Sequence, residues 1–473
     1  MIGHKKQNLL NRNLIALYIS GFLCPPNWQK NLCKKILYQI FTLETIAVFP
    51  AIITVQTIEL FHRFDDLFAT TAILFQLACF ISVYINFLYF LYYKPELIKL
   101  MDRIEIDFVP LMERVGSSKR RETILAERHE KSSSITILMI SMHIFVTTAW
   151  GILPWVLSYI DYFIKTEEEL AEVEIRNYFG CLMWLPENVM KSPKFEVMQL
   201  FHFWGIYGIV SNITSCYMIM FMLTFHTATI FRLICAAFED IDEFERSLRN
   251  EENFKKNSCV SDGKCVFVEI PSDEGFNENS NEEHDNISRN RKQENAQPFI
   301  NDANGSNVSN PQVNEEIRRR MNEYLINCIE FHQAAITYIE DLNDLVSPMV
   351  FIFFIFTEVM LCLSSFQLAL AKWDEKKIKF LSSVSCVFTW PLLLCIYGDD
   401  LKSSAVKESA FSIRWYCQSK TFNKLLQMVM IRAQQPVCIR AGKFYVATLE
   451  TFSDLCHKVY AYLTLLRQMY DNS

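Results

Sequence analysis

Residues 441–470 read AGKFYVATLETFSDLCHKVYAYLTLLRQMY. This stretch is long enough to cross a bilayer as a helix, since about 20 residues span the ~30 Å hydrocarbon layer. Polar side chains interrupt it at Glu450, Asp454, His457, Lys458, Arg467 and Gln468. Polar groups at membrane depth are costly unless they face protein or a wet cavity. The stretch therefore favours a helix that lines a pathway, with an interfacial or well packed last helix as the alternative.

Six further apolar stretches of spanning length precede it, at residues 37–60, 68–92, 135–160, 197–231, 349–371 and 380–397. Each is mostly free of charge, which is the pattern of a transmembrane helix. The sequence therefore predicts an all-α membrane protein with seven transmembrane helices.

The distribution of basic residues predicts the orientation of these helices, because cytoplasmic loops carry an excess of Lys and Arg. Most of the 46 basic residues fall inside if the N-terminus and the loops after the second, fourth and sixth helices are cytoplasmic. The loop after the third helix is acidic, with Glu167, Glu168 and Glu169, whereas Lys376 and Lys377 dissent in the loop after the fifth. We expect a cytoplasmic N-terminus and an extracellular C-terminus. A G-protein-coupled receptor has the reverse orientation, and a multispan transporter would favour an internal repeat that we do not find.

The cytoplasmic part is expected to contain helices that continue beyond the membrane. Residues 230–254 and 314–345 have helical apolar spacing, and residues 403–435 predict one cytoplasmic amphipathic helix, an anchor helix. The predicted organisation is an N-terminal segment (1–36), helices one to four (37–231), cytoplasmic extensions (232–348) with a disordered insert (255–313), helices five and six (349–397), the anchor segment (398–436) and helix seven (437–473).

The sequence carries no motif of an enzyme, since it has no GxGxxG, Walker-type, HExxH or GxSxG pattern. Its 15 cysteines are scattered and form no CxxC pair, and His143, His202 and His226 are isolated in apolar helices. We therefore expect neither metal nor cofactor, and the net charge of −7 gives no sign of a nucleic-acid partner. Glu358 marks a functional site or makes a hydrogen bond to a neighbouring helix.

The outer halves of the second, third, fourth and sixth helices predict a pocket. Within each helix the aromatic and small residues recur at spacings of three and four, so each group shares one helical face. Such a pocket would be mostly apolar and would suit a small, weakly polar organic molecule, whereas the alternative is ordinary packing. The candidates are Phe75, Cys79, Phe80, Thr147, Trp150, Gly151, Phe203, Tyr207, Val210, Ser383, Cys386 and Val387.

The carboxyl-terminal part of the chain carries a series of motifs: Ser409, Trp415-Tyr416, Gln434-Gln435-Pro436, Ala441-Gly442, Phe444, Leu449-Glu450-Thr451-Phe452 and the run from Tyr460 to Arg467. They resemble the carboxyl-terminal signature of insect odorant receptors. Cys395-Ile396-Tyr397-Gly398 followed by Leu401 resembles the end of the sixth helix in that family. Over the rest of the chain the resemblance rests on the predicted topology alone.

This resemblance implies a ligand-gated, non-selective cation channel of four subunits in the plasma membrane, where an odorant-binding subunit assembles with the olfactory co-receptor. The ligand would be a small volatile, and the other partners would be membrane lipids and cations. By local matching, the gate falls on Leu465 and Met469, with Gln468 and Tyr462 also in the pore, and the subunit anchor includes Trp415, Tyr416, Gln435 and Pro436. Arg467 is expected to face a neighbouring subunit or the headgroups. The nearest alternative is a gustatory receptor of the same superfamily, because Tyr462, Gln468 and Met469 approximate the ending of that branch.

Overall fold

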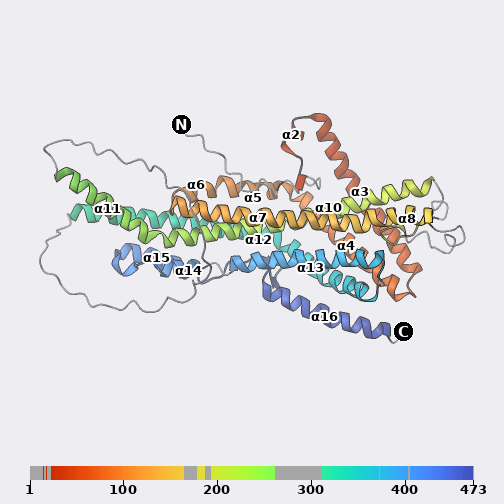
Figure 1. Cartoon of the computed structure of the whole chain (residues 1–473). Helices are drawn as coiled ribbons and strands as arrows, with labels where there is room; N and C mark the ends of the chain where they lie inside the picture. Colours follow the sequence, from red (N-terminus) through yellow and green to blue (C-terminus); the bar gives the residue numbers. More distant parts are fainter. Residues whose placement is uncertain are drawn as a thin grey trace, which may run out of the picture. The chain divides into compact units, whose positions relative to one another are not determined.

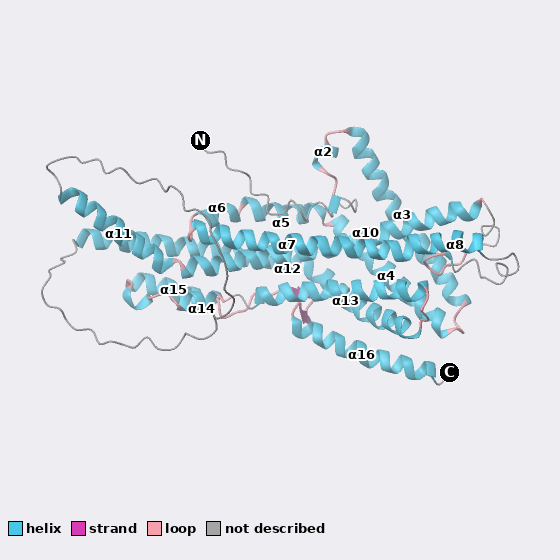
Figure 2. Cartoon of the chain, viewed as in Figure 1, coloured by secondary structure: helices cyan, strands magenta, loops and turns pink. Residues whose placement is uncertain are grey.

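The structure is a computed structural model that describes residues 14, 17–18, 23–164, 178–186, 193–260, 311–371, 373–402 and 405–471. These residues are almost entirely helical (Figure 2). They divide into a larger unit, residues 1–241 with 323–473, and a smaller unit, residues 242–322. The acidic residues Glu167, Glu168 and Glu169 and most of the predicted insert lie outside the described ranges.

The larger unit begins with α2 (Pro26–Gln29), α3 (Leu32–His62) and α4 (Leu67–Tyr92). Two short helices, α5 (Lys94–Ile106) and α6 (Phe108–Glu113), lead to α7 (Ser118–Thr147), the π-helix η1 (Thr148–Ile152) and α8 (Leu153–Ile164). The long helix α10 (Lys194–Glu239) follows (Figure 1). Asn31 and Asp66 cap α3 and α4, because each side chain accepts hydrogen bonds from two backbone N–H groups of the first turn.

Six helical segments in the described part of the chain are long and apolar enough to cross a membrane, and each overlaps one of the six apolar stretches predicted above. They are α3, α4, α7 with α8, α10, α12 (Pro311–Leu370) and α13 (Glu375–Lys402). This finding confirms the predicted all-α membrane fold. The last helix, which we predicted to be the seventh transmembrane helix, is not among them, because polar residues interrupt its apolar run.

Helix α10 forms the centre of the larger unit, where it contacts α4, α7 and α13. Its middle is buried on almost every side, including Met218, Met222 and Phe231. A helix that is apolar all round and packed in this way has no lipid-facing or water-facing stripe. The other helices are therefore positioned against α10.

The predicted cytoplasmic extensions are helical, with differences in where they break. Residues 314–345 and the fifth membrane stretch form the single helix α12, which continues through Pro348. In contrast, α10 ends at Glu239 and α11 (Ile241–Val260) starts after Asp240. Within the smaller unit, the Arg320 guanidinium lies 3.2 Å from the Glu251 carboxylate and joins the start of α12 to α11.

The prediction of one continuous helix over residues 403–435 is wrong. The segment forms α14 (Val406–Phe411), the 3-10 turn η4 (Trp415–Cys417) and α15 (Lys420–Arg432). Arg414 leaves the helical region with ψ of 60°, and the Ser419 hydroxyl then caps a new helix by accepting from the Phe422 N–H. A serine with this capping geometry favours a helix start over a helix interior.

The last helix begins later than the sequence suggested. Residues 441–448 are not helical, because β1 (Arg440–Ala441) pairs antiparallel with β2 (Tyr445–Val446), and α16 (Leu449–Asp471) starts only afterwards (Figure 2). Gly442 has φ of +62°, a conformation that glycine adopts readily and other residues resist. Its N–H donates to the Ser347 carbonyl at 3.0 Å, which attaches the hairpin to α12.

Candidate functional site

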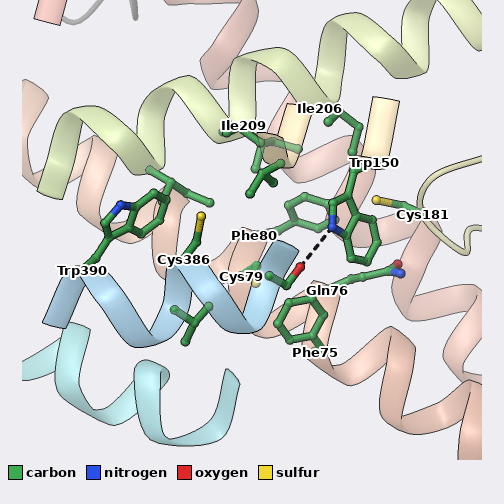
Figure 3. Close-up of a pocket in the computed structure, with 15 residues that line it drawn as sticks. Phe75, Gln76, Cys79, Phe80, Trp150, Cys181, Ile206, Ile209, Cys386 and Trp390 are labelled. Atoms are coloured by element: carbon green, nitrogen blue, oxygen red, sulfur yellow. Dashed lines mark hydrogen bonds between the residues drawn. The ribbon is translucent and has the colours of Figure 1, made fainter. Parts of the chain in front are cut away.

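An apolar cavity of about 80 Å³ lies where α4, η1, α10 and α13 meet (Figure 3). Residues 178–186, which follow α8 in the described chain, contribute Cys181 to its wall. The cavity is lined by Phe75, Gln76, Cys79, Phe80, Val146, Trp150, Cys181, Ile206, Ile209, Val210, Ile213, Ser383, Cys386, Val387 and Trp390. None of these lining side chains carries a formal charge at neutral pH.

Trp150 is held on both its polar and its apolar side. Its indole N–H donates to the Ser383 hydroxyl at 3.0 Å (dashed line in Figure 3). The same N–H donates to the Lys379 carbonyl at 3.1 Å, and both partners are on α13. Its ring meets Phe380 edge-on at 5.6 Å between centroids, and Phe75 lies 6.1 Å away. Because the N–H is already satisfied, the part of Trp150 that remains for a bound molecule is its apolar ring.

The π-helix η1 places Trp150 in this wall. A π-helical turn contains one residue more than an α-helical turn, so the residues after it are rotated relative to those before it. Gly151 lies against the Phe203 ring, where an added Cβ would be 2.9 Å from the ring. Segments of this kind are often found at functional sites.

Residues 178–186 close one side of the cavity. A Cβ at Gly180 would lie 1.9 Å from the Trp150 carbonyl oxygen, so only glycine allows this approach. The Cys181 N–H donates to His202 Nε2 at 3.3 Å, and the Leu182 N–H donates to Gln76 Oε1 at 3.1 Å. Burial raises the pKa of the Cys181 thiol to about 12, so the thiol is neutral at physiological pH.

Most of the residues predicted for a pocket meet at this cavity. They are Phe75, Cys79 and Phe80 on α4, Trp150 in η1, Val210 on α10, and Ser383, Cys386 and Val387 on α13. Their role in binding a ligand remains a prediction.

The other predicted residues, Thr147, Gly151, Phe203 and Tyr207, do not line the cavity. Tyr207 instead meets the His143 ring at 5.9 Å between centroids, and Gly151 and Phe203 pack against each other. Thr147 is the last residue of α7, and regular α-helical spacing from Trp150 does not hold across the π-helix that follows.

Sequence reasoning missed several lining residues: Gln76, Val146, Cys181, Ile206, Ile209, Ile213 and Trp390. Ile206 and Ile213 lie four residues before and three residues after Val210, so the same face of α10, followed further, would have included them. Cys181 could not be found this way, because it reaches the wall from outside any helix.

The last helix has one buried and one exposed side in this single chain. Phe452, Leu455 and Val459 are buried, and the Phe452 ring meets Phe388 of α13 at 5.2 Å. The predicted pore residues Tyr462, Leu465 and Met469 are 51%, 54% and 54% exposed, and Gln468 is also exposed.

The predicted anchor residues Trp415, Tyr416, Gln435 and Pro436 are exposed as well. Arg467 is exposed on α16, and its closest approach to Asp471, one turn later, is 4.0 Å. The structure of one chain therefore leaves free the surfaces that the pore and anchor predictions require.

Comparison with known proteins identifies the family. The family model for the 7tm Odorant receptor matches residues 68–460. Odorant receptor 67c of Drosophila melanogaster is 27% identical over 158 residues, and Odorant receptor Or2 of Anopheles gambiae is 28% identical over 146 residues. These alignments cover 32% and 30% of this chain and span only 38% and 39% of the two relatives.

A solved structure of the insect olfactory receptor OR5 from Machilis hrabei, in complex with eugenol, has the same fold. Its TM-score is 0.70 at 13% identity, and the superposition covers 98% of both chains. A second structure of the same receptor gives a TM-score of 0.67. Taken with the family match over most of its length, these findings show that the chain belongs to the 7tm odorant receptor family of insects.

Proposed function

We propose that this chain is the odorant-binding subunit of a non-selective cation channel in the plasma membrane, where it assembles with the olfactory co-receptor into a tetramer. The cavity beside Trp150 is the observation that carries the proposal. It is enclosed by helices of a membrane bundle, and its walls are apolar apart from Gln76, Ser383, the thiols and the indole N–H groups of Trp150 and Trp390. Such a site suits a small volatile that carries at most a few polar groups.

The helix α13 connects this cavity to the last helix. Ser383, Cys386 and Val387 line the cavity, and the next residue, Phe388, packs against Phe452 of α16. A ligand that changes the position of α13 would therefore act on α16 through this aromatic contact. For occupancy to open a pore, the ligand must bind the open form more tightly than the closed form.

The exposed side of α16 supports its proposed place in the pore. Leu465 and Met469 are one helical turn apart and more than half exposed, and four subunits would bring these apolar side chains together around one axis. A ring of this kind closes a channel by excluding water. Gln468, next to the gate, would face the passing cations.

The proposal is tested by expressing the chain with the olfactory co-receptor and recording currents while a panel of volatiles is applied. An inward cation current that begins within milliseconds and persists without intracellular GTP is the expected result. A response that disappears when GTP is removed would instead point to a G-protein-coupled mechanism, and silence towards every volatile would contradict the proposed ligand class. Antibody labelling of a C-terminal epitope on intact cells is the accompanying test of orientation, and it should succeed.

A further inference from the structure

A second cavity, of about 580 Å³, lies among the segments that follow α13 and is polar where the first is apolar. Its walls come from the end of α13, from α14, from the residues that follow α15, and from facing positions on α10 and α12. The lining residues are Phe231, His332, Lys402, Val406, Lys407, Glu408, Arg432, Ala433, Gln434, Gln435, Pro436 and Val437. Neither the odorant site nor the proposed pore uses this space, whereas two of the predicted anchor residues, Gln435 and Pro436, line it.

Positive charge dominates the walls of this cavity. Lys402, Lys407 and Arg432 line it, against the single carboxylate of Glu408. Arg432 is also 3.7 Å from the exposed carboxylate of Glu340, but neither lysine forms an ion pair with any residue that the structure describes. An excess of cationic side chains around one cavity attracts anions from solution.

His332 adds a buried polar group to the same wall. Its side chain belongs to α12 and is only 4% exposed, and its ring meets Phe231 at right angles, 6.2 Å between centroids. Within the described ranges the imidazole makes no hydrogen bond. Buried polar side chains usually have a hydrogen-bond partner, so this one is open to a partner that enters the cavity.

We propose that this cavity binds a phosphate-bearing anion. The guanidinium of Arg432 and the ammonium groups of Lys402 and Lys407 are the donors that phosphate oxygens accept from most strongly. The imidazole of His332, which also lines the cavity, can donate a further hydrogen bond. The volume exceeds that of a single phosphate, which favours an anion with two or more phosphate groups.

Two sources could supply this chemistry, a soluble polyphosphate or the headgroup of a phosphorylated inositol lipid. Lys402 ends α13, which is long and apolar enough to cross a membrane, so the cavity lies near the end of a spanning helix. In the orientation of the proposed function, this is the cytoplasmic end, where basic pockets between helices bind anionic headgroups. Occupancy would join the end of α13 to the segment after α15 through one anion.

The test uses the full chain, co-expressed and purified with the olfactory co-receptor, and two probes. The first probe is inorganic pyrophosphate. The second is phosphatidylcholine vesicles with or without phosphatidylinositol bisphosphate. We expect at least one probe to bind the wild-type complex, and the affinity of the Lys402→Gln/Lys407→Gln double variant to be weaker by about tenfold or more, because two charge-assisted contacts are lost.

The matched control is the double variant Lys420→Gln/Lys424→Gln, which removes the same charge from exposed lysines of α15 that do not line the cavity. This control should bind like the wild type. Binding of pyrophosphate identifies a soluble source, whereas binding only to vesicles that contain the inositol lipid identifies a headgroup. The proposal is overturned if neither probe binds the wild-type complex, or if the two double variants lose affinity equally.

Discussion

At the scale of single residues, the apolar cavity selects by shape more than by hydrogen bonding. The Trp150 N–H is used by Ser383 and Lys379, and Gln76 Oε1 accepts from Gln56 and from the Leu182 N–H. These polar groups fix the wall and leave mostly apolar surface for the ligand, with the buried Trp390 indole N–H as a lining donor that makes no hydrogen bond within the described part of the chain. The fit of a volatile should therefore depend chiefly on how much space the lining side chains leave.

Substitution of Val210 tests this dependence on space. The Val210→Phe variant adds a ring to the wall of a cavity of about 80 Å³. Overpacking of this kind costs about 1–3 kcal/mol, so the odorant concentration for half-maximal current should rise by a factor of roughly 5 to 150. The measurement is a dose–response curve with any activating volatile.

The matched control is Val197→Phe, the same change on the same helix at a side chain that is 66% exposed. It should leave the dose response unchanged. If Val210→Phe also matches the wild type while reaching the cell surface, the ligand does not occupy this cavity.

The residues of the site were only partly predictable from the sequence. Phe75, Val210 and Ser383 could be found because each lies on a helical face with regular spacing, and the predicted helices place the three residues at similar depth. The sequence could not show that Val146 lines the cavity and Thr147 does not, because the π-helix changes the helical phase just after these two residues. Cys181 depends on the long-range approach of Gly180 to Trp150, which no local pattern encodes.

At the scale of elements, α13 is the helix that connects the cavity to the last helix. Its residues from Ser383 to Trp390 contribute to the cavity wall, and its Gly398 lies against the segment that enters α16. A Cβ at Gly398 would be 2.1 Å from the Ala447 carbonyl oxygen, a distance that no packing tolerates. The close contact of α13 with this segment therefore requires glycine.

The Gly398→Ala variant should separate α13 from the entry to α16. We expect less receptor at the cell surface than for the wild type. The odorant current should fall by a larger factor than the amount of surface receptor measured by labelling. Gly208→Ala on α10 provides the comparison, since an added Cβ there meets nothing within 4 Å and should be tolerated. Equal currents per surface receptor in both variants would show that this contact does not transmit the signal.

A buried ion pair also fixes α13 against α7. Arg128 is 4% exposed, and its guanidinium lies 3.1 Å from the Asp400 carboxylate, while Arg232 of α10 pairs with the same carboxylate from a more exposed position. The Arg128 Nε donates in addition to the Thr229 hydroxyl at 3.0 Å. Asp400 is thus the shared counter-charge of two arginines on two helices.

The Asp400→Asn variant should destabilise the purified receptor by about 3–5 kcal/mol, because it leaves the buried Arg128 without its counter-charge. Arg232→Gln should cost at most about 1 kcal/mol, since that arginine is 46% exposed and its pairing is screened by water. Thermal unfolding of the two variants side by side measures the difference. If both variants lost the same stability, the burial of Arg128 would not determine how strongly its ion pair with Asp400 stabilises the receptor.

The helices were predictable where long apolar runs define them, and less predictable where local capping determines where a helix begins or ends. The spans around α4 and α10 can be predicted because hydrophobicity is averaged over about 20 residues, so that a single polar residue changes the average little. The break of the anchor segment at Arg414 and Ser419, and the late start of α16 after Gly442, depend on a few backbone angles. Amphipathic spacing continues across both breaks, so periodicity alone does not reveal them.

At the scale of the whole molecule, the architecture is that of the odorant receptor family, and the single chain leaves its last helix half uncovered. Phe452, Leu455 and Val459 pack inward, whereas Tyr462, Leu465 and Met469 remain exposed. Exposed apolar surface of this kind marks contact with another protein or with lipid. We infer that the surface is completed only when four subunits meet.

The central claim, that α16 of this chain lines a cation pore, is tested most directly by ion selectivity. In the Gln468→Glu variant, expressed with the olfactory co-receptor, a new carboxylate beside the gate should favour divalent cations. The reversal potential of the odorant-evoked current, measured with calcium as the main external cation, should then shift to more positive values. Gln427→Glu, on an exposed position of α15, should leave it unchanged. A normal current with an unaltered reversal potential in Gln468→Glu would contradict the claim that this helix faces the permeating ions.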